Sequence, residues 1–141
     1  MKTIKTRKVN IAIFWNGLRN MPPKEFNSVK ELENTSRILE TLKSAIPTFV
    51  DSILEGEKMN RDISLGVIKK DDTTKVRNDY YIKSTKIETD EGDEIIEVEL
   101  ENDEFNTFFE QFGKWGKNWF NKIELFLEAN NDINKGNKKV K

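Results

Sequence analysis

The stretch from Asp103 to Asn130 constrains the fold more than any other part of this chain. Its large apolar residues recur at steps of three and four, which is the repeat of one face of an α-helix. These residues are Phe105, Phe108, Phe109, Phe112, Trp115, Trp119, Phe120, Ile123, Phe126 and Leu127. At about 100° per residue they cover an arc of about 140°, which is wider than a surface helix needs. We therefore predict an aromatic helix over residues 103–130, with the other apolar residues packed around it.

Composition limits both the size of the core and the available chemistry. A chain of 141 residues is typical of one domain, but its hydrophobic fraction of 35% is low for a globular protein. The core is therefore expected to be thin, or completed by another chain. The sequence contains no cysteine and no histidine, which removes disulfides, thiolate chemistry, the usual general base and the usual zinc ligand. We expect a protein that is not an enzyme and that needs no cofactor.

The net charge of −1 conceals a strong segregation of charge along the chain. Residues 88–104 contain ten acidic residues and no basic residue, whereas the segments on either side are basic. Basic residues also precede the apolar run Val9 to Trp15, as in a signal peptide, but this run is too short and lacks a cleavage site. No stretch approaches the ~20 apolar residues of a membrane span. We expect no membrane association and a cytoplasmic location.

Two elements are predicted in the first half of the chain. Residues 7–19 fit either a helix face or strand alternation, and we favour the helix because no matching strand follows Asn16-Gly17. Ser28 and Glu31 form a capping box that opens a helix. The apolar phase of this helix continues across Pro47, so residues 28–56 are expected to form one kinked helix or two nearly coaxial ones.

The second half of the chain predicts strands before the aromatic helix. Residues 63–68 are expected to form a short strand, and residues 79–101 an acidic β-hairpin that turns around Gly92. In its second strand Ile96, Val98 and Leu100 alternate with glutamates. Asn102 is the expected N-cap of the aromatic helix. The predicted class is thus α+β, with one domain over residues 1–130 and a mobile basic tail over 131–141.

The acidic hairpin is the first candidate for a binding surface. Asp90, Glu91, Asp93 and Glu94 lie around its turn and do not have the spacing of a calcium loop. Such charges can simply block edge-to-edge strand pairing. They can also attract a basic protein partner, and a metal site is the third reading. We predict that these four residues contact a partner.

The aromatic helix is the second candidate. Lys114 and Lys117 alternate with tryptophans, as in proteins that stack nucleic-acid bases, but both tryptophans lie on the apolar face. Core packing is therefore the favoured reading, and nucleic acid is an unlikely partner. Because the apolar supply is small, part of the arc is expected to be covered by another copy or a partner. The residues expected to be left uncovered are Phe105, Phe108 and Phe126.

The order of these features carries a resemblance. A first helix ends in Leu18-Arg19-Asn20-Met21-Pro22-Pro23, a capped helix begins at Ser28, and an acidic strand from Ile95 to Glu101 enters a helix at Asn102. This order resembles small uncharacterised accessory proteins of phages of low-GC bacteria, which are often encoded near virion-assembly genes. It implies a structural or assembly subunit of a larger complex such as a virion, located in the host cytoplasm or the virion, that acts through protein–protein interaction or homo-oligomerisation. The alternatives are an inhibitor or adaptor that docks its acidic hairpin on a basic host protein, or a weak nucleic-acid binder.

Overall fold

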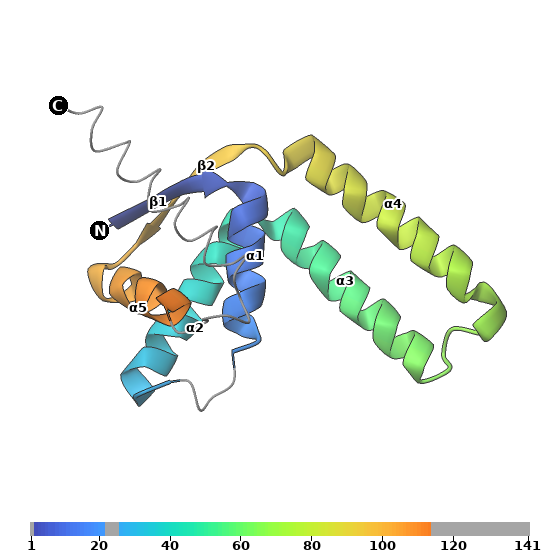
Figure 1. Cartoon of the computed structure of the whole chain (residues 1–141), viewed down its shortest axis with the longest axis horizontal. Coiled ribbons are helices and arrows are strands. Elements are labelled where there is room, and N and C mark those ends of the chain that lie inside the picture. Colours follow the sequence, from blue (N-terminus) through green and yellow to red (C-terminus); the bar gives the residue numbers. More distant parts are fainter. Residues whose placement is uncertain (1, 22–25, 114–141) are drawn as a thin grey trace.

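The computed structural model of the chain describes residues 2–21 and 26–113 (Figure 1). The elements follow in the order β1 (Lys2–Arg7), α1 (Lys8–Arg19), α2 (Val29–Ala45), α3 (Pro47–Ser64), the 3-10 turn η2 (Lys70–Asp72), α4 (Thr73–Glu91), β2 (Ile95–Leu100) and α5 (Asn102–Gly113). Helices pack against one face of a small antiparallel sheet, so the predicted α+β class is confirmed. The topology, however, differs from the prediction in several places.

The sheet is built from the two ends of the described chain. β1 pairs antiparallel with β2, with Ile4 opposite Val98 and Lys5 opposite Glu97. The predicted alternation in β2 is confirmed, because Val98 and Leu100 are buried while Glu97 and Glu99 are exposed. One face of the sheet therefore points into the core and the other carries charge. The strand at Lys2–Arg7 was not predicted, since this segment has a single large apolar residue.

Residues 79–101 do not form the predicted hairpin. Residues up to Glu91 belong to helix α4, and the strand β2 that follows pairs with β1 and not with residues 80–88. The aromatic and β-branched residues of Tyr80 to Glu88 favour a strand locally. Packing against α3 overrides this preference, because Tyr80, Ser84 and Ile87 lie at helical spacing and are half-buried against the rest of the protein.

The segment of residues 28–56 is divided at Pro47. Ser28 Oγ accepts a hydrogen bond from the Glu31 N–H at 3.2 Å, and the Glu31 side chain accepts one from the Asn27 N–H at 2.7 Å, so the predicted helix start is confirmed. α2 ends at Ala45 and α3 begins with Pro47 in its first turn, where a missing N–H costs nothing. The two helices point in clearly different directions and are not coaxial (Figure 1). α3 also continues past Gly56 to Ser64, which replaces the start of the strand predicted over residues 63–68.

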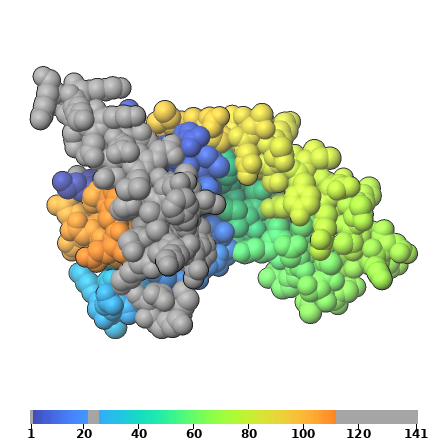
Figure 2. All heavy atoms as spheres, in the orientation of Figure 1, coloured from blue at the N-terminus to red at the C-terminus, as the bar shows by residue number. Residues whose placement is uncertain are grey.

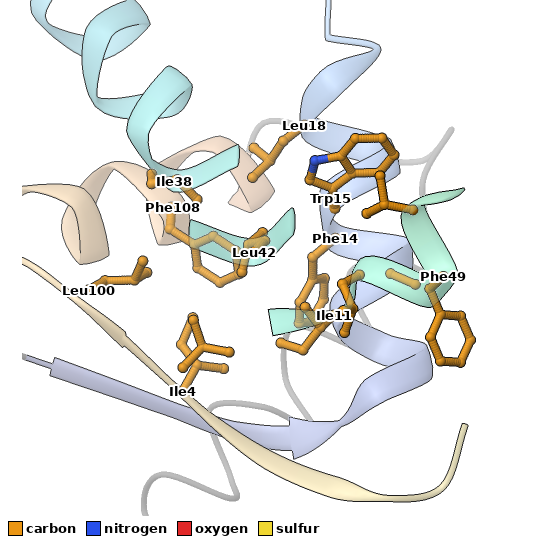
Figure 3. Packing of buried hydrophobic residues seen from close by; sticks show 14 of the residues in the cluster. Ile4, Ile11, Phe14, Trp15, Leu18, Ile38, Leu42, Phe49, Leu100 and Phe108 are labelled. Carbon is orange, nitrogen blue, oxygen red and sulfur yellow. The ribbon is translucent and has the colours of Figure 1, made fainter. Parts of the chain in front are cut away.

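The core lies between the sheet, α1, α2 and α5 (Figure 3). Residues 8–19 are helical, as favoured, and α1 buries Ile11, Phe14, Trp15 and Leu18. Phe14 meets Phe108 of α5 edge to face, with 5.4 Å between the ring centroids. The buried core residues come from β1, α1, α2, the start of α3, β2 and α5 and from positions next to them, and they are Ile4, Ile11, Ala12, Phe14, Trp15, Leu18, Met21, Ile38, Leu42, Ile46, Phe49, Val50, Val98, Leu100 and Phe108.

The described part of the aromatic helix is α5. It begins at Asn102, and Glu104 accepts a hydrogen bond from the Glu101 N–H at 3.2 Å, so Glu101 occupies the cap position predicted for Asn102. Phe108 is fully buried, and the expectation that it is uncovered is wrong. Phe105 is half-buried and its ring lies against Phe109. The predicted continuation of the helix to residue 130, Phe126 and the basic tail over residues 131–141 lie outside the described residues.

Helices α3 and α4 form an antiparallel pair that extends away from the other elements (Figure 1). We call this pair, residues 47–91, the projecting hairpin. The remaining described elements form the body, which contains the sheet and most of the core. In the space-filling view the hairpin stands out from the body, with α4 along its outside (Figure 2).

Candidate interaction surface

The projecting hairpin is held together by one aromatic contact near its middle. Tyr80 of α4 lies directly over Gly56 of α3, and a Cβ added at Gly56 would be 2.4 Å from the tyrosine hydroxyl oxygen. The hydroxyl donates a hydrogen bond to the backbone carbonyl of Ser52 at 2.9 Å. The glycine therefore allows the ring to approach the α3 backbone closely. Lys83 adds an ion pair across the two helices, 3.0 Å from Glu55.

The middle of α3 is fastened to the body by Arg19 of α1. Its guanidinium binds the carboxylate of Glu57 on α3 with two hydrogen bonds, one of them 3.0 Å long from Nη1 to Oε1. The hydrogen bond from Arg19 lowers the pKa of Glu57 below its ordinary value, with further contributions from the charges of Arg19 and Arg61 against the opposing effect of burial. Arg19 also lies over the ring of Trp15, 4.8 Å from its centroid. α1 and α3 are thus joined through the Arg19 guanidinium, whose position is also fixed by its contact with Trp15.

The tip of the hairpin exposes apolar side chains. α3 ends at Leu65, and Gly66 follows with a φ of 76°, the left-handed conformation that commonly terminates a helix. Leu65 and Val67 are 71% and 70% exposed. Single exposed apolar residues are ordinary, but these two flank the turn at the point farthest from the body.

Helix α4 contributes almost nothing to the core. It has 19 residues, all within the described part of the chain, and none of them is buried. Its half-buried residues face α3 and α1. The opposite side, which we call the outer face of α4, consists of Lys75, Asn78, Asp79, Ile82, Thr85, Lys86, Thr89 and Asp90. All eight are exposed and they span an arc of about 140°.

The centre of the outer face is apolar. Ile82 is 71% exposed and the neighbouring Tyr81 is 56% exposed. An open depression of about 450 Å³ runs along this part of the helix and is lined by Tyr81, Ile82, Thr85, Lys86, Thr89 and Asp90. A large apolar side chain in the middle of a charged helix face is typical of a surface that another helix covers.

Three of the four predicted acidic contact residues are engaged within the chain. Asp93 lies 3.5 Å from Arg7, and Lys8 lies 3.3 Å from Glu91 and 3.0 Å from Glu94. The hydrogen bond that Lys8 donates to Glu94 raises the pKa of Lys8, although burial opposes this. The backbone carbonyls of Gly92 and Glu94 also accept hydrogen bonds from the first N–H groups of α1, at 3.0 and 2.9 Å.

This acidic segment therefore completes the N-terminus of α1, which has no side-chain cap of its own. Negative charge is favourable there, because the N-terminal end of a helix is partially positive. Asp90 differs from the other three, since it forms no ion pair within the described residues and belongs to the outer face of α4.

The two other predicted contact residues that the structure describes lie on a different element from this face. Phe105 and Phe108 are on α5, in or beside the core, and Phe126 lies outside the described residues. The structure thus brings Asp90 together with residues that were not predicted, above all Lys75, Asp79, Ile82 and Lys86. The missed signal was the alternation of base and acid at steps of four and seven, which places all four charges on one side of a helix.

A second concave region lies where the hairpin joins the body. This groove of about 240 Å³ lies between α1, α3 and α4, with Ala12, Phe49 and Ile53 among its apolar lining residues and Glu88 as its charged one. In the described ranges, no three or more acidic residues are placed so that they could hold a metal ion. Nor does any helix of those ranges have the length and apolarity to cross a membrane.

Comparison of the chain with protein-family models, with curated proteins and with solved structures gives no match.

Proposed function

We propose that this chain is a non-enzymatic protein–protein interaction protein that serves as a structural or assembly subunit of a larger complex. The observation that carries the proposal is the projecting hairpin, whose helix α4 buries no residue and exposes Ile82 and Tyr81. The resemblance to phage accessory proteins supports a virion or its assembly as the setting. Without histidine or cysteine, the chain offers recognition more readily than catalysis.

The energetics of the hairpin support this role. An isolated helix of this length is marginally stable in water, and most helix stability in proteins comes from packing of an apolar face. α4 packs through a few half-buried residues, such as Val76, Tyr80 and Ile87. A partner on the outer face would bury Ile82 and Tyr81, and binding would stabilise the folded hairpin by mass action.

The internal ion pairs of the acidic segment count against the alternative role as an acidic adaptor. Glu91, Asp93 and Glu94 already pair with Arg7 and Lys8. A basic partner would have to compete with these bonds and with the capping of α1. The outer face of α4 has no such competitor, which favours recognition through the helix.

Site-specific photo-cross-linking in the full-length protein tests the proposal. A benzophenone amino acid is placed at Val67 or Ile82 on the hairpin, and at Glu40 or Glu99 on exposed surfaces of the body. The cells that naturally produce the chain are then illuminated and the adducts are identified by mass spectrometry. We expect the two hairpin positions to give the same protein adduct, whether with another protein or a second copy. Adducts that form equally at the body positions, or no adducts, would overturn the proposal.

A further inference from the structure

The charges on the outer face of α4 have an order that is complementary to itself. Along the helix the order is Lys75, Asp79, Lys86 and Asp90, which is base, acid, base, acid. Reversing the direction of the helix about a point next to Ile82 places Lys75 opposite Asp90 and Asp79 opposite Lys86. Every base then meets an acid, whereas in two parallel helices in register the charged side of each helix would face the uncharged side of the other.

The four charges also lie on the correct side of the helix for such a pairing. At about 100° per residue they fall within about 60° of one another, on one flank of Ile82. In a two-fold antiparallel pair of helices, each flank faces the same flank of the other copy. The opposite flank carries the uncharged residues Asn78, Thr85 and Thr89, and in the pair it faces the same uncharged flank of the other copy.

None of the four charges is satisfied elsewhere in the described parts of the chain. Lys75, Asp79, Lys86 and Asp90 are exposed and form no ion pair within residues 2–21 and 26–113. Each lysine precedes its aspartate by four residues, which is the less favourable orientation for an ion pair within a helix. The charges are thus available to a second chain.

From this arrangement we propose that two copies of the chain associate through an antiparallel pairing of α4 with α4, with Ile82 at the two-fold axis. This inference rests on the proposed function and names its partner. Ile82 of each copy enters the depression beside Ile82 of the other, and four ion pairs flank the axis. The projecting hairpins then lie alongside each other, with the two bodies at opposite ends.

The size of the contact sets the strength of the dimer. α4 is about 28 Å long and about 10–12 Å wide, so its face is smaller than the ~800 Å² per partner of a standard interface. The pairing should therefore be weak and depend on concentration. It should also weaken with added salt, because exposed charges are screened over about 8 Å at physiological ionic strength.

Charge-reversal variants of the full chain test the pairing by sedimentation equilibrium. One variant carries Asp79→Lys and Asp90→Lys, so that all four charges are positive, and the other carries Lys75→Glu and Lys86→Glu, so that all four are negative. Each variant alone should associate at least about tenfold more weakly than the natural chain, because four attractions become repulsions. An equimolar mixture should restore the dimer as a heterodimer. A variant that associates normally by itself, or a mixture that stays monomeric, would overturn the proposal.

Matched controls separate this geometry from net charge. Glu33→Lys with Glu40→Lys, and Lys30→Glu with Lys43→Glu, make the same changes of net charge on exposed positions of α2. These variants should associate like the natural chain, and their association should not depend on mixing. Circular dichroism establishes that every variant is folded.

Cysteine cross-linking determines the direction of the helices. The chain has no native cysteine, so Ile82→Cys should form a disulfide-linked dimer, while Glu33→Cys should not. A short bis-maleimide should join Lys75→Cys to Asp90→Cys in a mixture of the two variants. Linkage of Lys75→Cys to itself would show a parallel pair and overturn the proposal. If no self-association occurs but photo-cross-linking from Val67 and Ile82 still marks one other protein, this inference fails and the proposed function stands. If both are absent, both fail.

Discussion

The ring of Tyr80 occupies the space that a side chain at Gly56 would need, and its hydroxyl oxygen lies 2.4 Å from the position of that Cβ. The same hydroxyl donates its hydrogen bond to Ser52, one turn earlier in α3. This contact is central to the hairpin because α4 has no fully buried residue and packs on α3 through half-buried side chains such as Tyr80. The presentation of the outer face thus depends on a glycine on the neighbouring helix.

We predict that Gly56→Ala destabilises the protein although alanine is the better helix former. The added methyl group forces Tyr80 away from Ser52, and overpacking of this kind costs about 1–3 kcal/mol. Urea denaturation measures the change in the free energy of unfolding. In a Tyr80→Ala background the same substitution should be neutral or stabilising by up to about 1 kcal/mol, because the obstacle is gone. A neutral effect in the natural chain would mean that the tyrosine ring moves aside at little cost.

A second prediction concerns the two phenylalanines that were expected to be uncovered. Phe108 is fully buried and packs edge to face on Phe14, whereas Phe105 is half-buried beside Phe109. Phe108→Ala should therefore lower the free energy of unfolding by about 3–5 kcal/mol. Phe105→Ala should cost clearly less, since less apolar area returns to water. Thermal or urea unfolding compares the two, and equal losses would contradict the burial difference between them.

A third prediction follows from the lowered pKa of Glu57. A carboxyl group whose pKa is lower in the folded state contributes stability above its ordinary value of 4.5, and loses it as the pH falls through the lowered pKa. The side chain of Glu57 is 45% exposed, so solvent screening keeps the contribution small. Carboxyl-carbon NMR should find its pKa below 4.5, and Arg19→Gln should raise it.

Arg61→Gln is the matched control for this titration. The charge of Arg61 makes the smallest contribution to the lowered pKa of Glu57, and it acts without a hydrogen bond. Its removal should raise the pKa less than removal of Arg19 does. An equal or larger rise with Arg61→Gln would mean that Arg19 does not anchor the hairpin to the body.

The sequence predicted correctly those elements that depend on interactions between residues close together in the chain. The helix start at Ser28 depends on a side chain and a backbone N–H three residues apart, and the break at Pro47 on a missing N–H. The alternation in β2 and the start of α5 are equally local. A helix over residues 7–19 was favoured because no matching strand follows it, and residues 8–19 are indeed helical.

Long-range packing decided what these local interactions could not. Residues 80–88 have the composition of a strand but are helical, because this conformation lets Tyr80 pack against Gly56 on α3. The acidic residues after α4 were interpreted as a recognition edge, but Arg7 and Lys8 bring most of them into ion pairs at the start of α1. Neither Gly56, as the contact of Tyr80, nor Arg7 and Lys8, as the ion-pair partners of the acidic residues, could be identified from the local sequence.

By itself the sequence determined the α+β class, the helix cap at Ser28, the interruption at Pro47 and the apolar face of β2, because each of these local features depends on residues within a turn or two of one another. Only the tertiary structure decided that β1 pairs with β2, that Phe108 is core, and that α4 projects with an exposed face. These outcomes depend on which distant surfaces meet, and that is settled by the burial of apolar area across the whole chain. The order of charges in α4 can be read from the sequence. Only the finding that residues 73–91 are helical shows that these charges lie on one exposed face.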